Sequence, residues 1–446
     1  MIELRDYQKS IAKTALFYNT LIVLPTGLGK THIAFYIMQR YRTGLFLAPT
    51  KPLVIQQAEV FKQYKNDLEI ATGDSKREYK SSYIFATPQT IVNDLDILPK
   101  DRFDIIIFDE AHRAVGDYAY VKISKYFEPK RILGLTASPG SDLDKIREII
   151  TNLKIQKIEY RTEDDPDIIK YIHKKDVHYI YVNLSKEYVD IIEKIKLNAN
   201  KYLKILEENK IPKPTKSNLD RIADLIQKYN KNVFQSYAAY LTYSHILELL
   251  QTQSVKATVA YLNELFNGNY IERKVFNEVY PILKDLEIEH PKMEKLIELV
   301  KNLTSKTIIF SQYKVQIDYI EEKLKSIGLS VAKFVGKKSM NRKMQQEIID
   351  KFKNDEIRIL ISSSVGEEGL DIPNADNVIF YEPIPSAIRT IQRKGRTARF
   401  KDGKIYILVT RNTIDYYNLI ASRKKEMKMY NILKNFKIGL SAGGGI

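Results

Sequence analysis

The chain has 446 residues and a formal charge of +16, with 44% apolar and 28% charged residues. This is the composition of a soluble globular protein, and the length suits roughly three domains. The absence of cysteine excludes disulfides, thiolate metal sites and cysteine nucleophiles. Apolar runs stay below the roughly 18 residues of a membrane helix, and MIELRDYQKS lacks the apolar core of a secretory signal. We therefore expect an intracellular protein that does not enter a membrane.

The positive charge by itself fits a solvated basic surface as well as it fits a nucleic-acid-binding protein. Nucleic acid becomes the better interpretation if the charge accompanies recognisable binding elements, because cationic side chains release counterions from a phosphate backbone. The last residues, 441–446, read SAGGGI, which is typical of a flexible tail, and they are left out of the fold prediction.

In residues 1–168, short apolar runs alternate with helical patterns. The predicted strands are TLIVLP (20–25), GLFLAPT (44–50), YIFATP (83–88), FDIIIFDE (103–110) and RILGLTAS (131–138). Continuous apolar runs between helices predict a parallel sheet that is covered on both faces. Each run ends in polar residues, and the carboxyl edge of such a sheet is where open α/β folds bind ligands.

Residues 289–440 repeat this pattern, and we assign residues 169–185 to the same second sheet domain. The predicted strands there are DVHYIYVNLS (176–185), KTIIFSQY (306–313), SVAKFVG (330–336), IRILISSS (357–364), DNVIFYEP (376–383) and KIYILVT (404–410). Residues 186–288 instead carry apolar residues at three- and four-residue spacing, which predicts helices. The fold class is therefore α/β, with two parallel-sheet domains and an all-helical insertion.

The segment LPTGLGKT (24–31) follows the first predicted strand and resembles a phosphate-binding loop. Its glycines allow a tight turn whose N–H groups point at phosphate oxygens, its lysine can reach the β- and γ-phosphates, and the threonine after the lysine offers a hydroxyl to Mg²⁺. Leu24 stands where the full pattern has its first glycine, so an ordinary strand–turn–helix junction is the alternative. The nucleotide-binding candidates in this loop are Thr26, Gly27, Gly29, Lys30 and Thr31.

The segment FDIIIFDEAH (103–112) delivers two adjacent carboxylates at the end of a buried strand. Asp109 can hold Mg²⁺ through its water shell, and Glu110 can polarise the water that attacks the γ-phosphate. A strand end capped by solvated acids is the alternative for an isolated pair. The phosphate-loop pattern earlier in the same domain favours the catalytic interpretation.

The segment IQRKGRTARF (391–400) is rich in cationic residues. Arg396 and Arg399 are three residues apart, so on a helix they share a face and can reach one γ-phosphate as arginine fingers. A solvated charged face is the alternative. Because these arginines lie in the second sheet domain, ATP would bridge the two domains, and hydrolysis would release the bridge and move them.

Nine ordered motifs make the chain resemble a superfamily 2 helicase over nearly its whole length. They are LRDYQ (4–8), LPTGLGKT (24–31), APTKPLV (48–54), ATPQT (86–90), DEAH (109–112), TAS (136–138), IIFSQY (308–313), SSSVGEEGLDIP (363–373) and QRKGRTAR (392–399). With YEPIPSAIR and the helical insertion, the chain is most similar to the archaeal Hef helicases and the Fanconi-anaemia translocases. The RIG-I-like RNA sensors are the next most similar family.

The resemblance implies two RecA-like domains and assigns further residues. Arg5 and Gln8 would contact adenine, and His112 would couple the ATP site to Thr136 and Ser138 of the TAS motif. Gly369 and Asp371 would line the nucleotide from the second domain, and Gln392 would lie near the γ-phosphate. The implied backbone contacts to nucleic acid are Thr50, Lys51, Thr87, Gln89, Ser311, Gln312, Gly336 and Ser363. These residue types bond phosphates without reading bases, so sequence-independent binding is expected.

The resemblance implies an ATP-dependent DNA helicase or translocase that uses ATP and Mg²⁺. Its expected substrate is forked or branched DNA during fork repair, and its expected location is an archaeal nucleoid. The alternative is a duplex-RNA-dependent ATPase of the RIG-I-like type, and a metabolic ATPase that no nucleic acid stimulates is a third possibility. Lysines of the insertion could grip a DNA branch or form a solvated face; they are Lys213, Lys216, Lys228 and Lys231.

Two further patterns are weaker. The segment IERKVFNE (271–278) partly matches the ERKxxxD signature of the nucleases that accompany some Hef proteins, but Glu278 stands in the aspartate position and the segment lies within the helical insertion. Since the chain ends near residue 440, we expect no nuclease. His173 and His178 have a spacing that suits neither a helix face nor a zinc finger, so ordinary histidines are favoured over a metal site.

Overall fold

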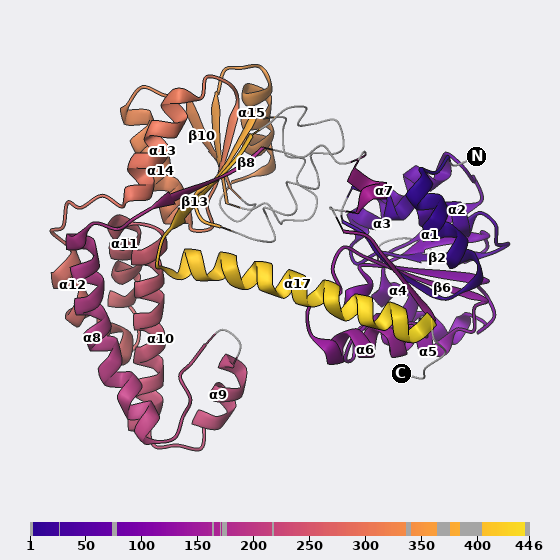
Figure 1. Cartoon of the computed structure of the whole chain (residues 1–446), viewed down its shortest axis with the longest axis horizontal. Helices are drawn as coiled ribbons and strands as arrows, with labels where there is room; N and C mark the ends of the chain where they lie inside the picture. The colour runs from indigo at the N-terminus through magenta and orange to yellow at the C-terminus, as the bar shows by residue number, and fades with distance from the viewer. Residues whose placement is uncertain are drawn as a thin grey trace.

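The computed structural model describes residues 3–25, 27–73, 78–162, 165–169, 171, 176–215, 218–335, 340–363, 375–383 and 404–441. Within these ranges the chain forms two parallel sheets, a group of helices that lies between them in the sequence, and a long C-terminal helix (Figure 1). The predicted fold class is confirmed. No helix in this part of the chain is both long and apolar enough to cross a membrane.

The first sheet has seven parallel strands in the order β3-β4-β2-β5-β6-β1-β7. Its strands are β1 (Thr20–Val23), β2 (Gly44–Leu47), β3 (Leu68–Ala71), β4 (Tyr83–Ala86), β5 (Ile105–Asp109), β6 (Arg131–Thr136) and β7 (Lys157–Tyr160). The five interior strands are the predicted ones. The edge strands β3 and β7 were not predicted, because a strand with only one neighbour tolerates charged residues, and LEIA and KIEY carry no continuous apolar run.

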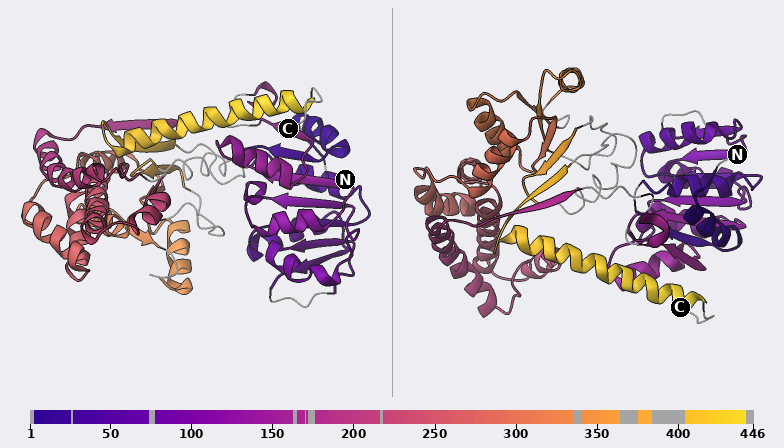
Figure 2. Two further views of the ribbon diagram at one scale, coloured as in Figure 1. Left: turned by 90° about the horizontal axis from the view of Figure 1, so that it is seen from below. Right: turned by 45° about the horizontal axis from the view of Figure 1, so that its top comes forward.

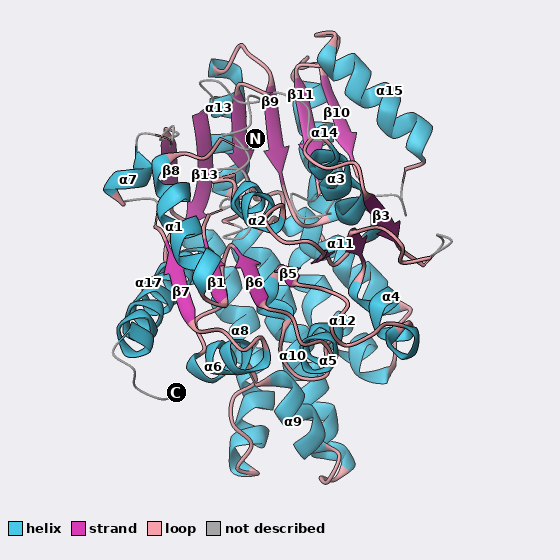
Figure 3. Ribbon diagram, turned by 90° about the vertical axis from the view of Figure 1, so that its right-hand side faces the viewer, coloured by secondary structure: helices cyan, strands magenta, loops and turns pink. Residues whose placement is uncertain are grey.

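Helices cover both faces of the first sheet (Figure 3). One face packs against α1, α2 and α3, and the other packs against α4, α5 and α6. The helical segments of this part are α1 (Asp6–Phe17), α2 (Lys30–Met38), α3 (Lys51–Lys62), α4 (Pro88–Asn93), η1 (Leu95–Ile97), η2 (Ala111–Arg113), α5 (Ala119–Tyr126), α6 (Leu143–Asn152) and α7 (Pro166–Ile169). Two apolar cores therefore hold the carboxyl ends of the strands in fixed positions.

The second sheet has six parallel strands in the order β10-β11-β9-β12-β13-β8. Its strands are β8 (Val177–Val182), β9 (Thr307–Phe310), β10 (Val331–Phe334), β11 (Ile359–Ser362), β12 (Asn377–Phe380) and β13 (Lys404–Thr410). Helices α13 (Pro291–Asn302) and α14 (Lys314–Ser326) cover one face, and α15 (Arg342–Lys353) covers the other. Strand β8 pairs with β13, so the chain enters the second sheet before it forms the helical group.

The helical group consists of α8 (Lys186–Glu208), α9 (Leu219–Ile226), α10 (Lys231–Thr252), α11 (Val255–Phe266) and α12 (Tyr270–Leu283). Four of these helices share one apolar core, while α9 packs at the far end of α8 and α10. Glu278 lies on α12 and accepts hydrogen bonds from the hydroxyls of Tyr202 and Tyr243. The residue that resembled part of a nuclease signature therefore joins α12 to α8 and α10.

The last helix, α17 (Ile414–Ser441), contacts both sheets (Figures 1 and 2). Leu419, near its start, belongs to the core of the second sheet. Met429, Ile432 and Leu433 belong to the core of the first sheet, together with residues of α5 and α6. A sequence segment that we assigned to the second domain thus ends among side chains of the first.

We expect the substitution Leu433→Ala to lower the free energy of unfolding by about 2–4 kcal/mol, because it removes a fully buried side chain from the core of the first sheet. Met427 lies six residues earlier on α17 and is 67% exposed, so Met427→Ala should change stability by less than about 0.5 kcal/mol. Urea unfolding monitored by circular dichroism compares the variants. Identical unfolding curves would contradict the docking of this helix end.

Candidate functional site

Most of the predicted site residues that the structure describes follow strands at the carboxyl edges of the two sheets, while Arg5 and Gln8 lie at the start of α1. In the first sheet the nucleotide candidates follow β1, β5 and β6, which are adjacent strands, and the nucleic-acid candidates follow β2 and β4, the next two strands. In the second sheet the nucleic-acid candidates follow β9 and β11, which are also neighbours. Strand order therefore separates the predicted nucleotide residues from the predicted polymer contacts along the carboxyl edge of the first sheet.

The loop between β1 and α2 depends on glycine. Gly29 has φ 71° and ψ 38° and directly precedes α2, and Gly27 has φ 84°. A Cβ atom at position 29 would lie 2.4 Å from Nε2 of Gln8. Residue 29 thus requires glycine for its left-handed backbone and for the close approach of the Gln8 side chain.

Two side chains of helix α1 form hydrogen bonds to this loop. The Tyr7 hydroxyl donates to the carbonyl oxygen of Leu28 at 2.8 Å, and Nε2 of Gln8 donates to the same oxygen at 3.1 Å. Oε1 of Gln8 in turn accepts from the backbone N–H of Arg5 at 2.9 Å. Gln8 therefore shapes the loop directly, and Tyr7, which the sequence analysis did not select, does the same.

Lys30 is the first residue of α2, and Thr31 follows it in the first turn. Nζ of Lys30 donates to the carbonyl oxygen of Leu24 at 2.8 Å, at the end of β1. The positive charge of Lys30 helps to lower the pKa of Glu110 and opposes the rise that burial causes in the pKa of Asp109. The structure therefore brings the predicted phosphate-binding lysine close to the predicted acidic pair.

The pKa values of the two carboxyl groups of the acidic pair are shifted in opposite directions. Burial and the adjacent charge of Glu110 raise the pKa of Asp109 to about 6, although Lys30 opposes this shift. Burial also disfavours the charged form of Glu110, but its hydrogen bond with His112 and the charges of His112 and Lys30 outweigh burial and lower its pKa. Glu110 is therefore ionised at neutral pH, as a general base must be.

His112 lies between Glu110 and the TAS motif. Its Nδ1 is 3.3 Å from Oε2 of Glu110 and 3.2 Å from Oγ1 of Thr136. The Thr136 hydroxyl donates to the carbonyl oxygen of Ser138 at 3.1 Å, so its proton is used and Nδ1 of His112 must be the donor. The Ser138 hydroxyl then donates to the sulfur of Met429 on α17 at 3.1 Å.

A tyrosine that the sequence analysis did not select supports the acidic pair. The hydroxyl of Tyr120, on α5, donates to the backbone carbonyl oxygen of Asp109 at 2.6 Å. Tyr120 is fully buried against Phe108 of β5, with their ring centroids 5.1 Å apart. Only the spacing of apolar residues in α5 marks it in the sequence, and that spacing does not distinguish it from an ordinary core residue.

The donor set suits Mg²⁺ better than a metal held entirely by protein. Among the described residues, no three His, Asp or Glu side chains form a group that could hold a metal ion. Mg²⁺ is commonly bound by one or two carboxylates together with substrate phosphates and water. Asp109 and the Thr31 hydroxyl, beside a phosphate-type loop, are compatible with that kind of site.

The nucleic-acid candidates of the first sheet stand at two helix starts. Thr50 precedes α3 and Lys51 is its first residue, while Thr87 precedes α4 and Gln89 lies in its first turn. Lys51 and Gln89 are exposed, and both threonines are half-buried. Helix N-termini carry free N–H groups and partial positive charge, so these positions suit phosphate groups.

In the second sheet, the two predicted nucleic-acid contacts that follow β9, Ser311 and Gln312, both form hydrogen bonds to Glu382. Ser311 is fully buried, and its hydroxyl donates to Glu382 at 3.3 Å, while the backbone N–H of Gln312 donates to the same carboxylate. The Gln312 residue is exposed and Ser363, after β11, is half-buried. Ser311 thus supports the chain behind Gln312, and Glu382, which was not predicted as a site residue, sets the position of both.

A buried charge cluster lies behind Glu382. Nζ of Lys292 forms an ion pair with Asp415 at the start of α17 and donates to the carbonyl oxygen of Thr252 at the end of α10, at 2.8 Å. Burial raises the pKa of Glu382 to about 7, while the charge of Lys292 opposes the shift and Asp415 adds to it. The second sheet, the helical group and α17 therefore meet at one set of buried ionisable groups.

Several predicted site residues lie outside the described residues. They are Thr26 of the phosphate loop, Gly336, Gly369 and Asp371, and the predicted γ-phosphate contacts Gln392, Arg396 and Arg399. Lys216 of the insertion and His173 lie outside them as well. Their roles remain predictions.

Comparison with known proteins identifies the family. Residues 1–141 match the family described as type III restriction enzyme, res subunit, and residues 291–401 match the helicase conserved C-terminal domain. The crystal structure of the Pyrococcus furiosus Hef helicase domain has a TM-score of 0.77 and 36% identity, over 94% of this chain and 98% of that chain. The chain belongs to the Hef/FANCM type of superfamily 2 helicases. The predicted resemblance is confirmed.

Relatives of this Hef-type chain are longer than the chain itself. A Methanocaldococcus jannaschii protein, whose name assigns it provisionally to the ATP-dependent RNA helicases, is 39% identical over 97% of this chain and 61% of its own length. The ATP-dependent DNA helicase fml1 of Schizosaccharomyces pombe is 34% identical over 92% of this chain and 57% of its own length. The chain spans about three fifths of these two relatives.

We expect the substitution Glu382→Gln to change how stability depends on pH. Because burial raises the pKa of Glu382 from 4.5 to about 7, the folded state binds this proton more tightly than the unfolded state. Its contribution to stability is therefore complete below about pH 4.5 and is lost as pH rises to about 7. Between pH 5 and pH 8, the wild type should lose on the order of 2 kcal/mol more stability than the variant. Parallel pH dependences in urea unfolding would contradict this assignment.

Proposed function

We propose that the chain is an ATP-hydrolysing motor that moves along or unwinds forked or branched DNA. One observation carries the proposal: Lys30 is close enough to lower the pKa of Glu110, and His112 contacts both Glu110 and Thr136, which links the acidic pair to the TAS motif. A hydrolytic site needs only the first two of these residues. The remaining pair suits an enzyme in which the state of the γ-phosphate is transmitted to another part of the molecule.

In the proposed mechanism, each residue of this edge has a separate task. Backbone N–H groups of the loop around Gly29 and the ammonium group of Lys30 bind the phosphates. Glu110, whose pKa is lowered, accepts a proton from the attacking water. Mg²⁺, when bound near Asp109 and Thr31, would neutralise charge on the phosphates. Its charge would also favour the ionised form of Asp109, whose pKa is otherwise about 6.

We further propose that the second domain completes the site. Arg396 and Arg399 act as arginine fingers, with Gln392 near the γ-phosphate and Gly369 and Asp371 along the nucleotide. The support is the family and the positions of these residues in its motifs, since two cationic groups close to the γ-phosphate stabilise the charge of the transition state.

The proposed domain boundaries follow from the fold and the sequence. The first RecA-like domain comprises residues 1–168, and the second comprises residues 169–185 and 289–440, with the helical insertion at 186–288 and a tail at 441–446. The pairing of β8 with β13 supports the split second domain. The docking of the end of α17 on the first sheet makes that helix a connection between the two domains.

The DNA is proposed to cross the carboxyl edges of both sheets. Lys51 and Gln89 are exposed at one edge and Gln312 at the other, and none of these side chains requires a particular base. The exposed lysines of the insertion, Lys213 and Lys228 among them, add positive charge for a branch or a duplex. Because its proposed substrate is DNA, the proposed location of the activity is inside the cell, at the nucleoid.

We expect Lys30→Ala and Glu110→Gln each to reduce ATP hydrolysis by at least about 100-fold, because one removes a phosphate-binding cation and the other removes the general base. Binding of forked DNA should change by less than about threefold, since neither residue lies at the predicted polymer contacts. A phosphate-release assay and fluorescence anisotropy measure the two quantities. Lys62→Ala and Glu59→Gln, both on the exposed side of α3, serve as matched controls. Turnover at the control rate in either variant would refute the catalytic assignment.

Substrate class is tested by comparing ATPase stimulation by forked DNA, linear duplex DNA and duplex RNA at equal nucleotide concentration. We expect the order forked DNA, duplex DNA, RNA, because the family includes DNA helicases and the predicted contacts accept any backbone. Stronger stimulation by duplex RNA would favour the RIG-I-like alternative. The provisional name of the Methanocaldococcus jannaschii relative mentions RNA, without specifying a RIG-I-like protein. A rate that no nucleic acid changes would favour a metabolic ATPase.

A further inference from the structure

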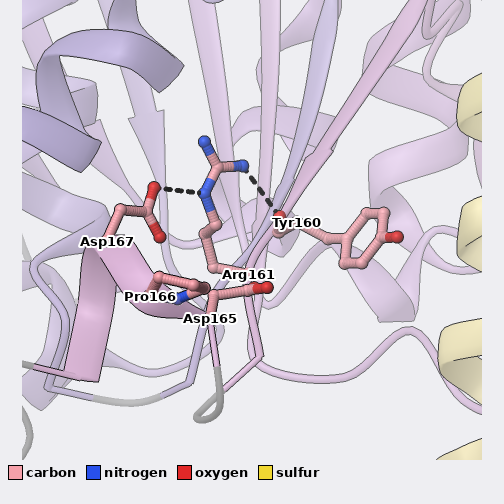
Figure 4. A pocket seen from close by; sticks show the side chains of 5 residues that line it. All are labelled: Tyr160, Arg161, Asp165, Pro166 and Asp167. Atoms are coloured by element: carbon pink, nitrogen blue, oxygen red, sulfur yellow. Dashed lines mark hydrogen bonds and ion pairs between the residues drawn. The ribbon is translucent and has the colours of Figure 1, made fainter.

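The segment that follows β7 is held to the first sheet by hydrogen bonds and ion pairs of Arg161. At the end of β7, Arg161 donates through Nε to Asp167 at 2.8 Å and through Nη1 to the carbonyl oxygen of Tyr160 at 2.9 Å (Figure 4). Its Nη1 also lies 3.3 Å from Glu159, which accepts a hydrogen bond from Thr14 of α1 at 2.8 Å. The Arg161 side chain is only 15% exposed. These bonds hold the short helix α7 against the end of the strand, beside a cavity of about 350 Å³.

Helix α7 in turn rests on α1. Ile168 is fully buried in the core that contains Leu4, Tyr7 and Leu28. Three residues later, the Tyr171 ring lies 5.4 Å from the Tyr7 ring, and Cζ of Arg5 lies 4.7 Å from the centroid of Tyr171. The hydrogen bonds of Arg161 and the burial of Ile168 thus place the ring of Tyr171 against the first turn of α1.

This ring touches two of the three residues that surround the predicted base-binding end of the nucleotide site. Arg5 is a predicted adenine contact, and Tyr7 holds the carbonyl oxygen of Leu28 in the phosphate loop. The third residue, Gln8, donates to that same oxygen. Neither the spacing of the helicase motifs nor the composition of residues 161–171 assigned any role to Tyr171.

We propose that Tyr171 is a positioning residue for the purine base of the nucleotide, and that it acts by holding the guanidinium group of Arg5. A guanidinium is planar and stacks on aromatic rings, so a ring on one side fixes its orientation and leaves the other side to stack on a base. Arg5 is otherwise an exposed side chain at the start of a helix, with several rotatable bonds. Tyr171 removes part of the entropy cost that Arg5 would incur on binding the base.

This inference deepens the proposed function, because it rests on ATP binding at the phosphate loop. It also adds a connection: the residue that orients the base contact belongs to the segment between the two sheets. The test therefore measures the nucleotide dependence of hydrolysis separately from its dependence on DNA, with the complete chain and saturating forked DNA.

We expect Tyr171→Ala to raise KM for ATP about fivefold, with kcat within twofold of the wild type, because the loss is confined to base binding. Tyr171→Phe keeps the ring and should behave as the wild type. Tyr171→Leu keeps apolar bulk against Tyr7 without a ring and should match the alanine variant. KM for GTP should rise by a similar factor in both ring-less variants, because a guanidinium group stacks on either purine.

A double-mutant cycle tests the route through Arg5. In an Arg5→Ala background, Tyr171→Ala should change KM by less than about twofold, because its partner is already absent. Tyr18→Leu is the matched control: Tyr18 lies just beyond the other end of α1, with Nζ of Lys157 at 5.4 Å from its ring, and the variant should leave KM unchanged.

Three results would overturn the proposal: an unchanged KM in both ring-less variants, an equal effect of Tyr171→Ala with and without Arg5, or the same loss in Tyr171→Phe as in Tyr171→Ala. Thermal unfolding of each variant separates these results from a loss of folded protein. Failure of the proposed function would look different, since the wild type would then hydrolyse no ATP or show no response to nucleic acid.

Discussion

Two hydrogen bonds from α1 to the carbonyl oxygen of Leu28 hold the loop on which the predicted nucleotide site depends. They come from Tyr7 and Gln8, and a Cβ atom at position 29 would lie 2.4 Å from Nε2 of Gln8, so any side chain there would displace the Gln8 amide. The loop, the first turn of α1 and the end of β1 therefore behave as one rigid unit. Tyr171 adds contacts from the segment that follows β7, so the proposed recognition of the nucleotide would depend in part on that segment.

In the described part of the second sheet domain, buried charged groups set the positions of the predicted site residues after β9. Glu382 orients Ser311 and Gln312, and Lys292 pairs with Asp415 of α17 while it also bonds the end of α10. Breaking one partner of such a buried pair is strongly destabilising, because it leaves a charge without compensation. The predicted polymer contact, the helical insertion and α17 are consequently difficult to separate from one another, and a change in any of them should be felt at the others.

The sequence predicted the parts of this molecule that depend on neighbours along the chain. Interior strands were found because burial on both faces requires continuous apolar runs, and the acidic pair and the phosphate loop were found because each lies within a few consecutive residues. The edge strands β3 and β7 were missed because their charged residues hide the pattern. Tyr7, Glu382 and the contact of Ser138 with Met429 were missed because their partners are 21, 70 and 291 residues away, and no local spacing encodes such contacts.

Helix α17 also limits how the two sheets can move. Leu419 is seated in one core and Met429 in the other, and ten helical residues separate them by about 15 Å along the axis. A hydrogen-bonded helix resists compression, so this spacing acts as a rod of fixed length. A movement that brings the two carboxyl edges together must therefore rotate the domains about α17 or remove Leu419 or Met429 from its core. The contact between Ser138 and Met429 would then change when the domains rotate.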